Sequence, residues 1–181
     1  LLEDGEVDCI WGCFSMNGRE DKYLWAGPYL YSRQMVAVRM DSEIQKLKDL
    51  TGKMIAVQET SKAEEYFLRS DFEGIPDVSL VYCFSNMDEV FAALRKNYVE
   101  AICGHESALI SFINTAPDEY RLLDESFLYS ALGVAFDIQY DEEFVEELFK
   151  TLGDMMNDGT IAAIVGKYGL DAEKSLGRGN D

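Results

Sequence analysis

Residues 2–38, LEDGEVDCIWGCFSMNGREDKYLWAGPYLYSRQMVAV, decide how the rest of the chain is interpreted. Residues 2–7 are typical of the end of a helix that turns at Gly5. Residues 8–12 follow as a short apolar run bounded by glycine, a pattern that predicts a buried strand. The stretch therefore predicts a change from helix to strand, and the strand should give way to a loop at its closing glycine.

The loop carries Cys13, Ser15 and Arg19, and the aromatic-proline turn at residues 25–29 then opens a long apolar run. This order of features, a G-x-x-D pattern, a serine-bearing loop, an arginine, a hydrophobic-small-x-Pro-Tyr turn and a β-rich run, resembles the bacterial extracellular solute-binding proteins of family 3. The run IQKLKDLTGKMIAVQ at residues 44–58 is similar to the entry into the second lobe of these proteins. The resemblance implies an α/β, two-lobed type 2 periplasmic-binding fold.

The composition favours a folded, acidic protein. The chain has 181 residues, 48% of them hydrophobic, which is enough for a sizeable core. It carries 34 acidic against 16 basic residues, and this balance argues against nucleic acid as a partner. The sequence shows no signal peptide and no apolar run long enough to span a membrane, so we expect targeting information to have been removed or to lie outside this stretch.

The four cysteines show no close C-x-x-C pair, and the chain has one histidine. We therefore expect no metal site and no cofactor. Cys9, Cys83 and Cys103 lie in strand-like runs and are expected to be buried, whereas Cys13 lies in the loop and is expected to be exposed. The sequence leaves open whether any of them form a disulfide.

Strand and helix patterns alternate through the rest of the chain, which favours a parallel sheet covered by helices. The predicted strands are residues 32–40, 54–58, 78–84, 99–103 and 127–136. The predicted helices are residues 44–50, 62–69 after Ser61, 87–96 after Ser85 or Asn86, 108–113, 142–156 after Asp141, and 161–168. The polar tail from Asp171 is expected to be frayed.

The resemblance implies that the chain crosses twice between two lobes, near residues 34–40 and 130–137. Residues 1–38 and 133–181 would form lobe 1, and residues 39–132 would form lobe 2. The opening strand-helix-strand unit of the family has no counterpart in the sequence, so lobe 1 is expected to be incomplete.

An incomplete lobe 1 should have one of two visible consequences. Its sheet would be finished by another chain, or it would leave an exposed apolar edge around residues 9–11.

The resemblance also implies a carboxylate-binding loop. It places Arg19 at the arginine of the family, Ser15 at its hydroxyl group, and Gly12, Cys13 and Phe14 at neighbouring ligand-binding positions. A guanidinium presents a planar fork of donors that matches a carboxylate.

The loop departs from the family pattern in one respect. Met16-Asn17-Gly18 makes the spacing between serine and arginine one residue shorter than the family pattern, so Arg19 could be aimed differently. The alternative for Arg19 is a weak surface pair with Glu20 or Asp21.

In lobe 2 the resemblance places Thr60 and Ser61 at a helix start that suits an anion, with plain helix capping as the alternative. His105 stands where the family has an acidic residue that holds the α-ammonium group of the ligand. A neutral imidazole is a poorer partner for a cation. Glu106 could take that role, the ligand could lack an α-ammonium group, or binding could have been lost.

Three functions follow. The first is extracytoplasmic binding of an amino acid or a related small carboxylate, with a membrane permease of an ABC importer or a fused membrane signalling domain as partner. The second is a dehydratase or lyase on the same fold, for which only His105, Glu59 and Glu106 are placed as acid or base. The third is a degenerate module that relays contacts without a ligand.

Overall fold

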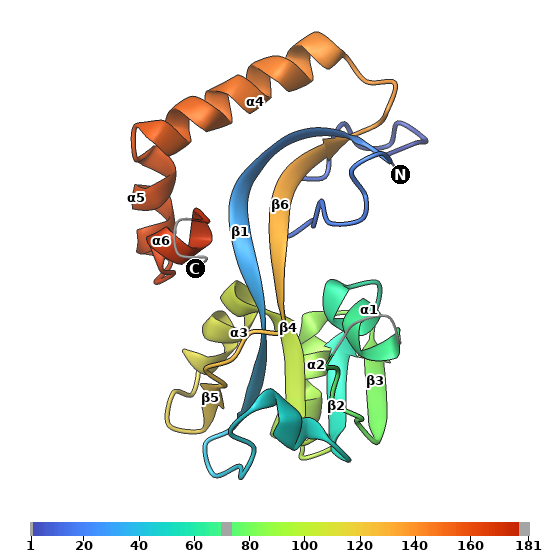
Figure 1. The fold of residues 1–181 in the computed structure, drawn as a ribbon, viewed down its shortest axis with the longest axis vertical. Coiled ribbons are helices and arrows are strands. Elements are labelled where there is room, and N and C mark those ends of the chain that lie inside the picture. The colour runs from blue at the N-terminus through green and yellow to red at the C-terminus, as the bar shows by residue number, and fades with distance from the viewer. Residues whose placement is uncertain (1, 70–73, 178–181) are drawn as a thin grey trace. The chain divides into compact units, whose positions relative to one another are not determined.

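The computed structural model describes residues 2–69 and 74–177, and the chain forms two compact units. Unit 1 comprises Leu1–Ser32 and Tyr129–Asp181, and unit 2 comprises Arg33–Leu128. The chain passes between the units within β1 (Leu24–Arg39) and at the start of β6 (Leu128–Phe136), which pair with each other (Figure 1). Two lobes with two crossing segments are the architecture that the sequence predicted.

The other elements follow the alternation of strand and helix expected from the sequence. The remaining strands are β2 (Met54–Gln58), β3 (Leu80–Phe84), β4 (Ala101–His105) and β5 (Tyr120–Leu122). The helices are the 3-10 helix η1 (Leu47–Leu50), α1 (Lys62–Leu68), α2 (Met87–Arg95), α3 (Glu106–Ile113), α4 (Glu142–Asn157), α5 (Thr160–Lys167) and α6 (Ala172–Ser175).

Unit 2 is built on a sheet with the strand order β3-β2-β4-β1-β5. Strand β2 lies between β3 and β4 and is parallel to both, since Ile55 is in register with Val81 on one side and with Ala101 on the other. Strand β1 runs antiparallel to β4 and β5. The prediction that residues 54–58 form a central parallel strand is confirmed.

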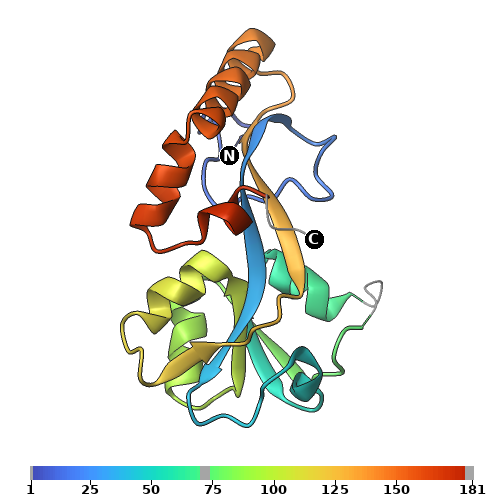
Figure 2. The same ribbon diagram turned by 60° about the vertical axis from the view of Figure 1, so that its left-hand side comes forward.

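Successive side chains of these strands point to opposite faces of the sheet, and each face has its own core. On one face Ile55 and Val57 pack with Tyr66 of α1, and on the other Ala56 packs with Leu94 of α2. Helix α1 therefore covers one face and α2 and α3 cover the other (Figure 2). A sheet buried on both faces explains the continuous apolar run of β2.

Three predicted helix starts are confirmed by their capping bonds. The side chain of Ser61 accepts from the backbone N–H of Glu64, that of Asn86 from Glu89, and that of Asp141 from Glu143 and Phe144. These bonds satisfy backbone donors that the first turn of a helix leaves without a partner.

In unit 1, helix α4 packs against β1 and β6, and helix α5 packs against β1. Val134 and Phe136 of β6 pack with Val145 and Leu152 of α4, and a second cluster joins α5 to α6. The predicted apolar face of α4 is only partly covered, because Phe144 is 49% exposed and Phe149 is 53% exposed.

The N-terminal predictions were partly wrong. Residues 2–6 form a turn in which the N–H of Gly5 donates to the carbonyl of Leu2, and not the end of a helix. Residues 8–12 contribute only an isolated bridge between Ile10 and Ala135 instead of a buried strand. Trp11 is 57% exposed, whereas Cys9 and Ile10 are half-buried.

Two further predictions need correction. The helix expected over residues 44–50 is reduced to η1, because the carboxylate of Asp49 accepts from the N–H groups of Gln45 and Lys46 and so holds them outside a helix. The tail was expected to be frayed from Asp171, but residues 171–177 are ordered. The side chain of Asp171 caps α6, and Leu176 is buried against α5.

The cysteines are not all placed as expected. Cys103 is buried and Cys13 is exposed, as the sequence predicted, whereas Cys83 is exposed because β3 lies at the edge of the sheet. None of the helices in the described ranges has both the length and the apolar character that crossing a membrane requires.

Candidate functional site

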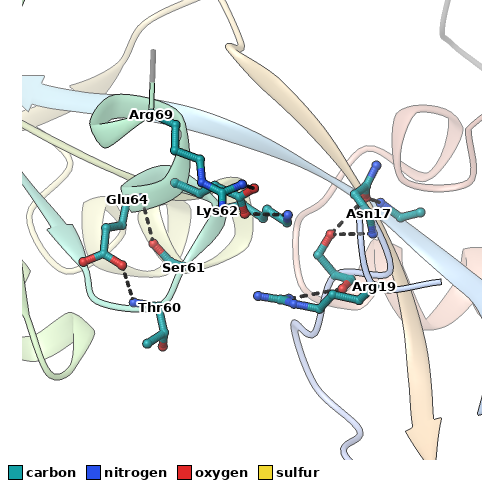
Figure 3. A network of polar contacts seen from close by, with 10 residues as sticks. Asn17, Arg19, Thr60, Ser61, Lys62, Glu64 and Arg69 are labelled. Carbon is teal, nitrogen blue, oxygen red and sulfur yellow. Dashed lines mark hydrogen bonds and ion pairs between the residues drawn. The ribbon is translucent and has the colours of Figure 1, made fainter. Parts of the chain in front are cut away.

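The predicted carboxylate-binding arginine belongs to a tight turn of unit 1, residues 15–19, which we call the arginine turn. The backbone N–H of Arg19 donates to the carbonyl of Met16 at 2.8 Å, and its Nη1 donates to the carbonyl of Ser15 at 3.2 Å (Figure 3). The guanidinium lies 4.8 Å from the ring centroid of Phe14. The head of Arg19 is thus held by one backbone acceptor and one aromatic face, which leaves other donors of its fork for a ligand.

Three aromatic rings support this turn. Phe14 stacks on Trp25 with 5.6 Å between centroids, and Tyr23 meets both rings edge-on. The indole N–H of Trp25 donates to the carbonyl of Arg19 at 3.1 Å. Phe14, predicted as a ligand-binding residue, therefore joins the arginine to a rigid aromatic cluster.

Ser15 is only 2% exposed, and its hydroxyl is used inside the turn. It donates to Oδ1 of Asn17 at 2.9 Å and accepts from the backbone N–H of Asn17 at 3.3 Å. The same Oδ1 accepts from the backbone N–H of Ala131 at 2.9 Å. The sequence pointed to Ser15 as the hydroxyl donor but missed Asn17, whose second partner lies more than a hundred residues further along the chain.

Gly12 and Cys13 lie at the other end of the loop. The carbonyl of Gly12 accepts from the hydroxyl of Tyr29 at 2.6 Å, and Cys13 is exposed. Burial, with a smaller contribution from Cys13, raises the pKa of Tyr29 to about 12. Tyr29 therefore stays protonated and remains a hydrogen-bond donor over the physiological pH range.

In unit 2, Thr60 and Ser61 form the turn between β2 and α1. Thr60 has a positive φ of 58°, which is uncommon for a β-branched residue and marks local strain. Its N–H donates to the carboxylate of Glu64 at 2.7 Å (Figure 3). The hydroxyl of Ser61 donates to the carbonyl of Gln58 at 2.6 Å. Both groups predicted to bind an anion thus have partners within the turn.

His105 ends β4 and precedes the first residue of α3. The side-chain nitrogen of Gln34 lies 3.0 Å from Nδ1 and 3.2 Å from Nε2 of the imidazole. Burial lowers the pKa of His105 to about 4. The imidazole is therefore neutral at pH 7.

Glu106 is bound by an arginine that the sequence did not single out. The Nε of Arg33 donates to Oε2 of Glu106 at 2.9 Å, and Nη2 pairs with Oε1. The two side chains are only 17% and 16% exposed. This two-point pairing neutralises the carboxylate that could have replaced the missing acid at residue 105.

The predicted residues fall into two groups, one in each unit. Gly12, Cys13, Phe14, Ser15 and Arg19 belong to unit 1. Thr60, Ser61 and His105 belong to unit 2, where they follow or end the neighbouring parallel strands β2 and β4. The carboxyl ends of parallel strands are the usual place for ligands in open α/β sheets, so the unit 2 group lies at the edge where binding is expected.

The buried imidazole predicts a specific loss of stability in acid. Its pKa is below the ordinary value of 6.5, so the unfolded chain binds a proton that the folded unit excludes. The contribution of His105 to the free energy of unfolding is fully present above about pH 6.5 and is lost as the pH drops toward 4. The loss is about 2 kcal/mol at pH 4.5. Urea unfolding at pH 7 and pH 4.5 measures this loss.

His105→Asn supplies the control for the acid effect. The chain has one histidine, so the variant removes its only imidazole. The difference between wild type and variant should therefore isolate residue 105. An equal acid dependence in the two proteins would contradict the buried neutral imidazole.

Comparison with known proteins gives consistent results. The model of the family described as bacterial extracellular solute-binding proteins, family 3, matches residues 1–171. The glutamate-binding protein GluB of Corynebacterium efficiens is 27% identical over 169 residues, 88% of this chain. The putative amino-acid ABC transporter-binding protein PatH of Vibrio harveyi is 28% identical over 178 residues, 96% of this chain and 70% of its own length.

A solved structure supports the same fold. The crystal structure of Tv2483 bound to L-arginine superposes with a TM-score of 0.79 and 25% sequence identity, over 93% of this chain and 68% of the other. The chain spans 55% of the length of GluB.

Proposed function

The chain belongs to family 3 of the bacterial extracellular solute-binding proteins, and on that premise we propose that it binds an amino acid or a related small carboxylate. The observation that carries the proposal is the fixed guanidinium of Arg19, held by the carbonyl of Ser15 and the ring of Phe14. A positioned guanidinium binds a carboxylate by two parallel hydrogen bonds, and fixing it beforehand lowers the entropy lost on binding.

The relatives support this ligand class. The named proteins bind glutamate or L-arginine or serve an amino-acid ABC transporter. The proposal assigns the ligand carboxylate to Arg19, and assigns Thr60, Ser61 and His105 to the rest of the ligand. The partner would be the membrane permease of an importer or a fused membrane signalling domain, and the location extracytoplasmic.

The chemistry of His105 and Glu106 restricts the class of ligand that the site favours. A neutral imidazole and a carboxylate already neutralised by Arg33 are weak partners for an ammonium group. We therefore expect the best ligands to include small carboxylates without an ordinary α-ammonium group. His105 also argues against a lyase or dehydratase, because a base with a pKa of about 4 is weak at neutral pH.

The test is a thermal-shift screen of matched ligand pairs on the natural full-length polypeptide. Each pair differs only at the α-position, for example L-glutamate against 2-oxoglutarate. Calorimetry then measures the affinity of each hit. Because charge-assisted hydrogen bonds contribute about 1.5–3 kcal/mol each, Arg19→Ala should weaken binding roughly ten- to a hundredfold.

Arg69→Ala is the matched control, since Arg69 is an exposed arginine that pairs with Glu65 at 2.9 Å. It should leave the affinity unchanged. Tight binding that Arg19→Ala does not weaken would refute the role of Arg19. Preference for the amino acid in every pair would refute the narrower ligand class, and the absence of any hit would favour a module that relays contacts without a ligand.

A further inference from the structure

We propose that Asn17 is a positioning residue, which aims Arg19 by fastening the arginine turn to strand β6. The proposal deepens the proposed function and rests on it, because it explains how the carboxylate-binding group is held. The side chain of Asn17 bonds to Ser15 and to Ala131, and it acts on Arg19 through the turn between them.

The fastening has two parts. Oδ1 of Asn17 accepts from the hydroxyl of Ser15 and from the backbone N–H of Ala131, both at 2.9 Å. The backbone N–H of Met16 donates to the carbonyl of the same Ala131 at 2.8 Å. The N–H and the carbonyl of Ala131 on β6 therefore both bind the turn. The N–H binds the side chain of Asn17, and the carbonyl binds the backbone of Met16.

The hold passes to Arg19 through two short contacts. The backbone N–H of Arg19 donates to the carbonyl of Met16, and its guanidinium donates to the carbonyl of Ser15. Met16 and Ser15 are the residues that Asn17 and Ala131 fix. A shift of the turn relative to β6 would therefore move both the backbone and the head of Arg19.

A purely structural role would make a different prediction. Fixing the turn contributes only modestly to folding, because a typical hydrogen bond adds little net stability. Two-point binding of a carboxylate, however, needs the guanidinium within about 0.5 Å and 10–20° of its productive position. Loss of Asn17 should therefore weaken binding more than its effect on stability explains.

The first test compares Asn17→Ala with Asp141→Ala. Asp141 caps α4 in the same unit, and its side chain also accepts two hydrogen bonds, from the N–H groups of Glu143 and Phe144. Both variants should lower the melting temperature. For the strongest ligand of the matched-pair screen, Asn17→Ala should reduce affinity roughly tenfold, while Asp141→Ala leaves it unchanged.

The double variant Asn17→Ala, Arg19→Ala shows whether Asn17 acts through the arginine. If it does, adding Asn17→Ala to Arg19→Ala should cost no further affinity. Additive losses would overturn the proposal, as would unchanged affinity in Asn17→Ala. If Asn17→Ala does not fold, Asn17→Gln, which moves the carboxamide by one methylene, carries the same expectation.

A second measurement needs no ligand, so it separates failure of this proposal from failure of the proposed function. NMR signals of the Arg19 Nε–H and the Trp25 indole report the turn directly, because the indole donates to the carbonyl of Arg19. Asn17→Ala should shift both signals, whereas Asp141→Ala should not. Asn17→Asp retains the accepting oxygen and should keep both signals near wild type.

The two results together decide between the proposals. A wild type that binds no ligand, with both signals shifted in Asn17→Ala, would refute the proposed function and retain the positioning role. Unshifted signals in Asn17→Ala would refute the positioning role even if the wild type binds.

Discussion

Gly133→Ala is expected to destabilise the protein by roughly 2–3 kcal/mol, in the upper part of the range for overpacked sites. A Cβ atom at Gly133 would lie 2.8 Å from Sδ of Met16 and 2.8 Å from Cε3 of Trp25. Met16 has a flexible side chain, but Trp25 is held by its stack on Phe14 and its bond to Arg19. The strain should therefore displace the arginine turn as well as lower stability.

Gly153→Ala is the matched control. Gly153 lies inside α4, and a Cβ atom there would meet nothing within 4 Å. Alanine in a helix interior is favoured over glycine, so this variant should be more stable by about 0.5–1 kcal/mol. Urea unfolding measures both changes, and equal stability of Gly133→Ala and wild type would contradict the close packing around β6.

Removal of one partner of the Arg33–Glu106 pair is expected to cost unit 2 about 3 kcal/mol. Both side chains are largely buried, and Glu106→Leu removes a carboxylate that Arg33 binds at two points. Breaking such a pair is costly because it leaves a charge in a poorly solvated place. Chemical unfolding of Glu106→Leu and Arg33→Met measures the effect.

The double variant Arg33→Met, Glu106→Leu should recover most of the loss, since two apolar side chains of similar size leave no charge behind. Arg69→Met, at an arginine side chain that is 62% exposed, should change stability by less than about 1 kcal/mol. A double variant as unstable as either single variant would show that the pair is not the reason for the loss.

Local signals in the sequence predicted strand β2 and three helix starts well. Residues 54–58 form a short apolar run, and Ser61, Asn86 and Asp141 have the side-chain oxygens that helix starts require. These features depend on neighbours within a few residues, so spacing alone reveals them.

Features that depend on distant partners were not predicted. Residues 8–12 look like a buried strand, but the described residues give them a single bridge, at Ile10. Cys83 looks like a core cysteine, but its strand lies at the edge of the sheet. Asp171 did offer a local cap signal, which the polar composition of the tail obscured.

The candidate site shows the same division. Family resemblance was enough to single out Arg19 and His105, because the family pattern can be aligned to their positions along the chain despite the shorter loop and the missing acid. Asn17 and Arg33 were missed, since Asn17 depends on Ala131 and Arg33 depends on Glu106. Their roles appear only when the fold brings β6 and α3 to them.

The discontinuous sequence of unit 1 has a consequence for the order of folding. Unit 2 is one continuous segment, whereas unit 1 needs residues from both sides of it. In folded unit 2 the two ends lie side by side, since the N–H of Phe127 donates to the carbonyl of Gln34 at 3.0 Å. If unit 2 folds first, the two segments of unit 1 are joined by a folded unit with neighbouring ends instead of by a long flexible loop. Most of the loop-closure entropy for bringing these two segments together would then already have been lost. During synthesis, unit 2 can be completed before the last part of unit 1 leaves the ribosome.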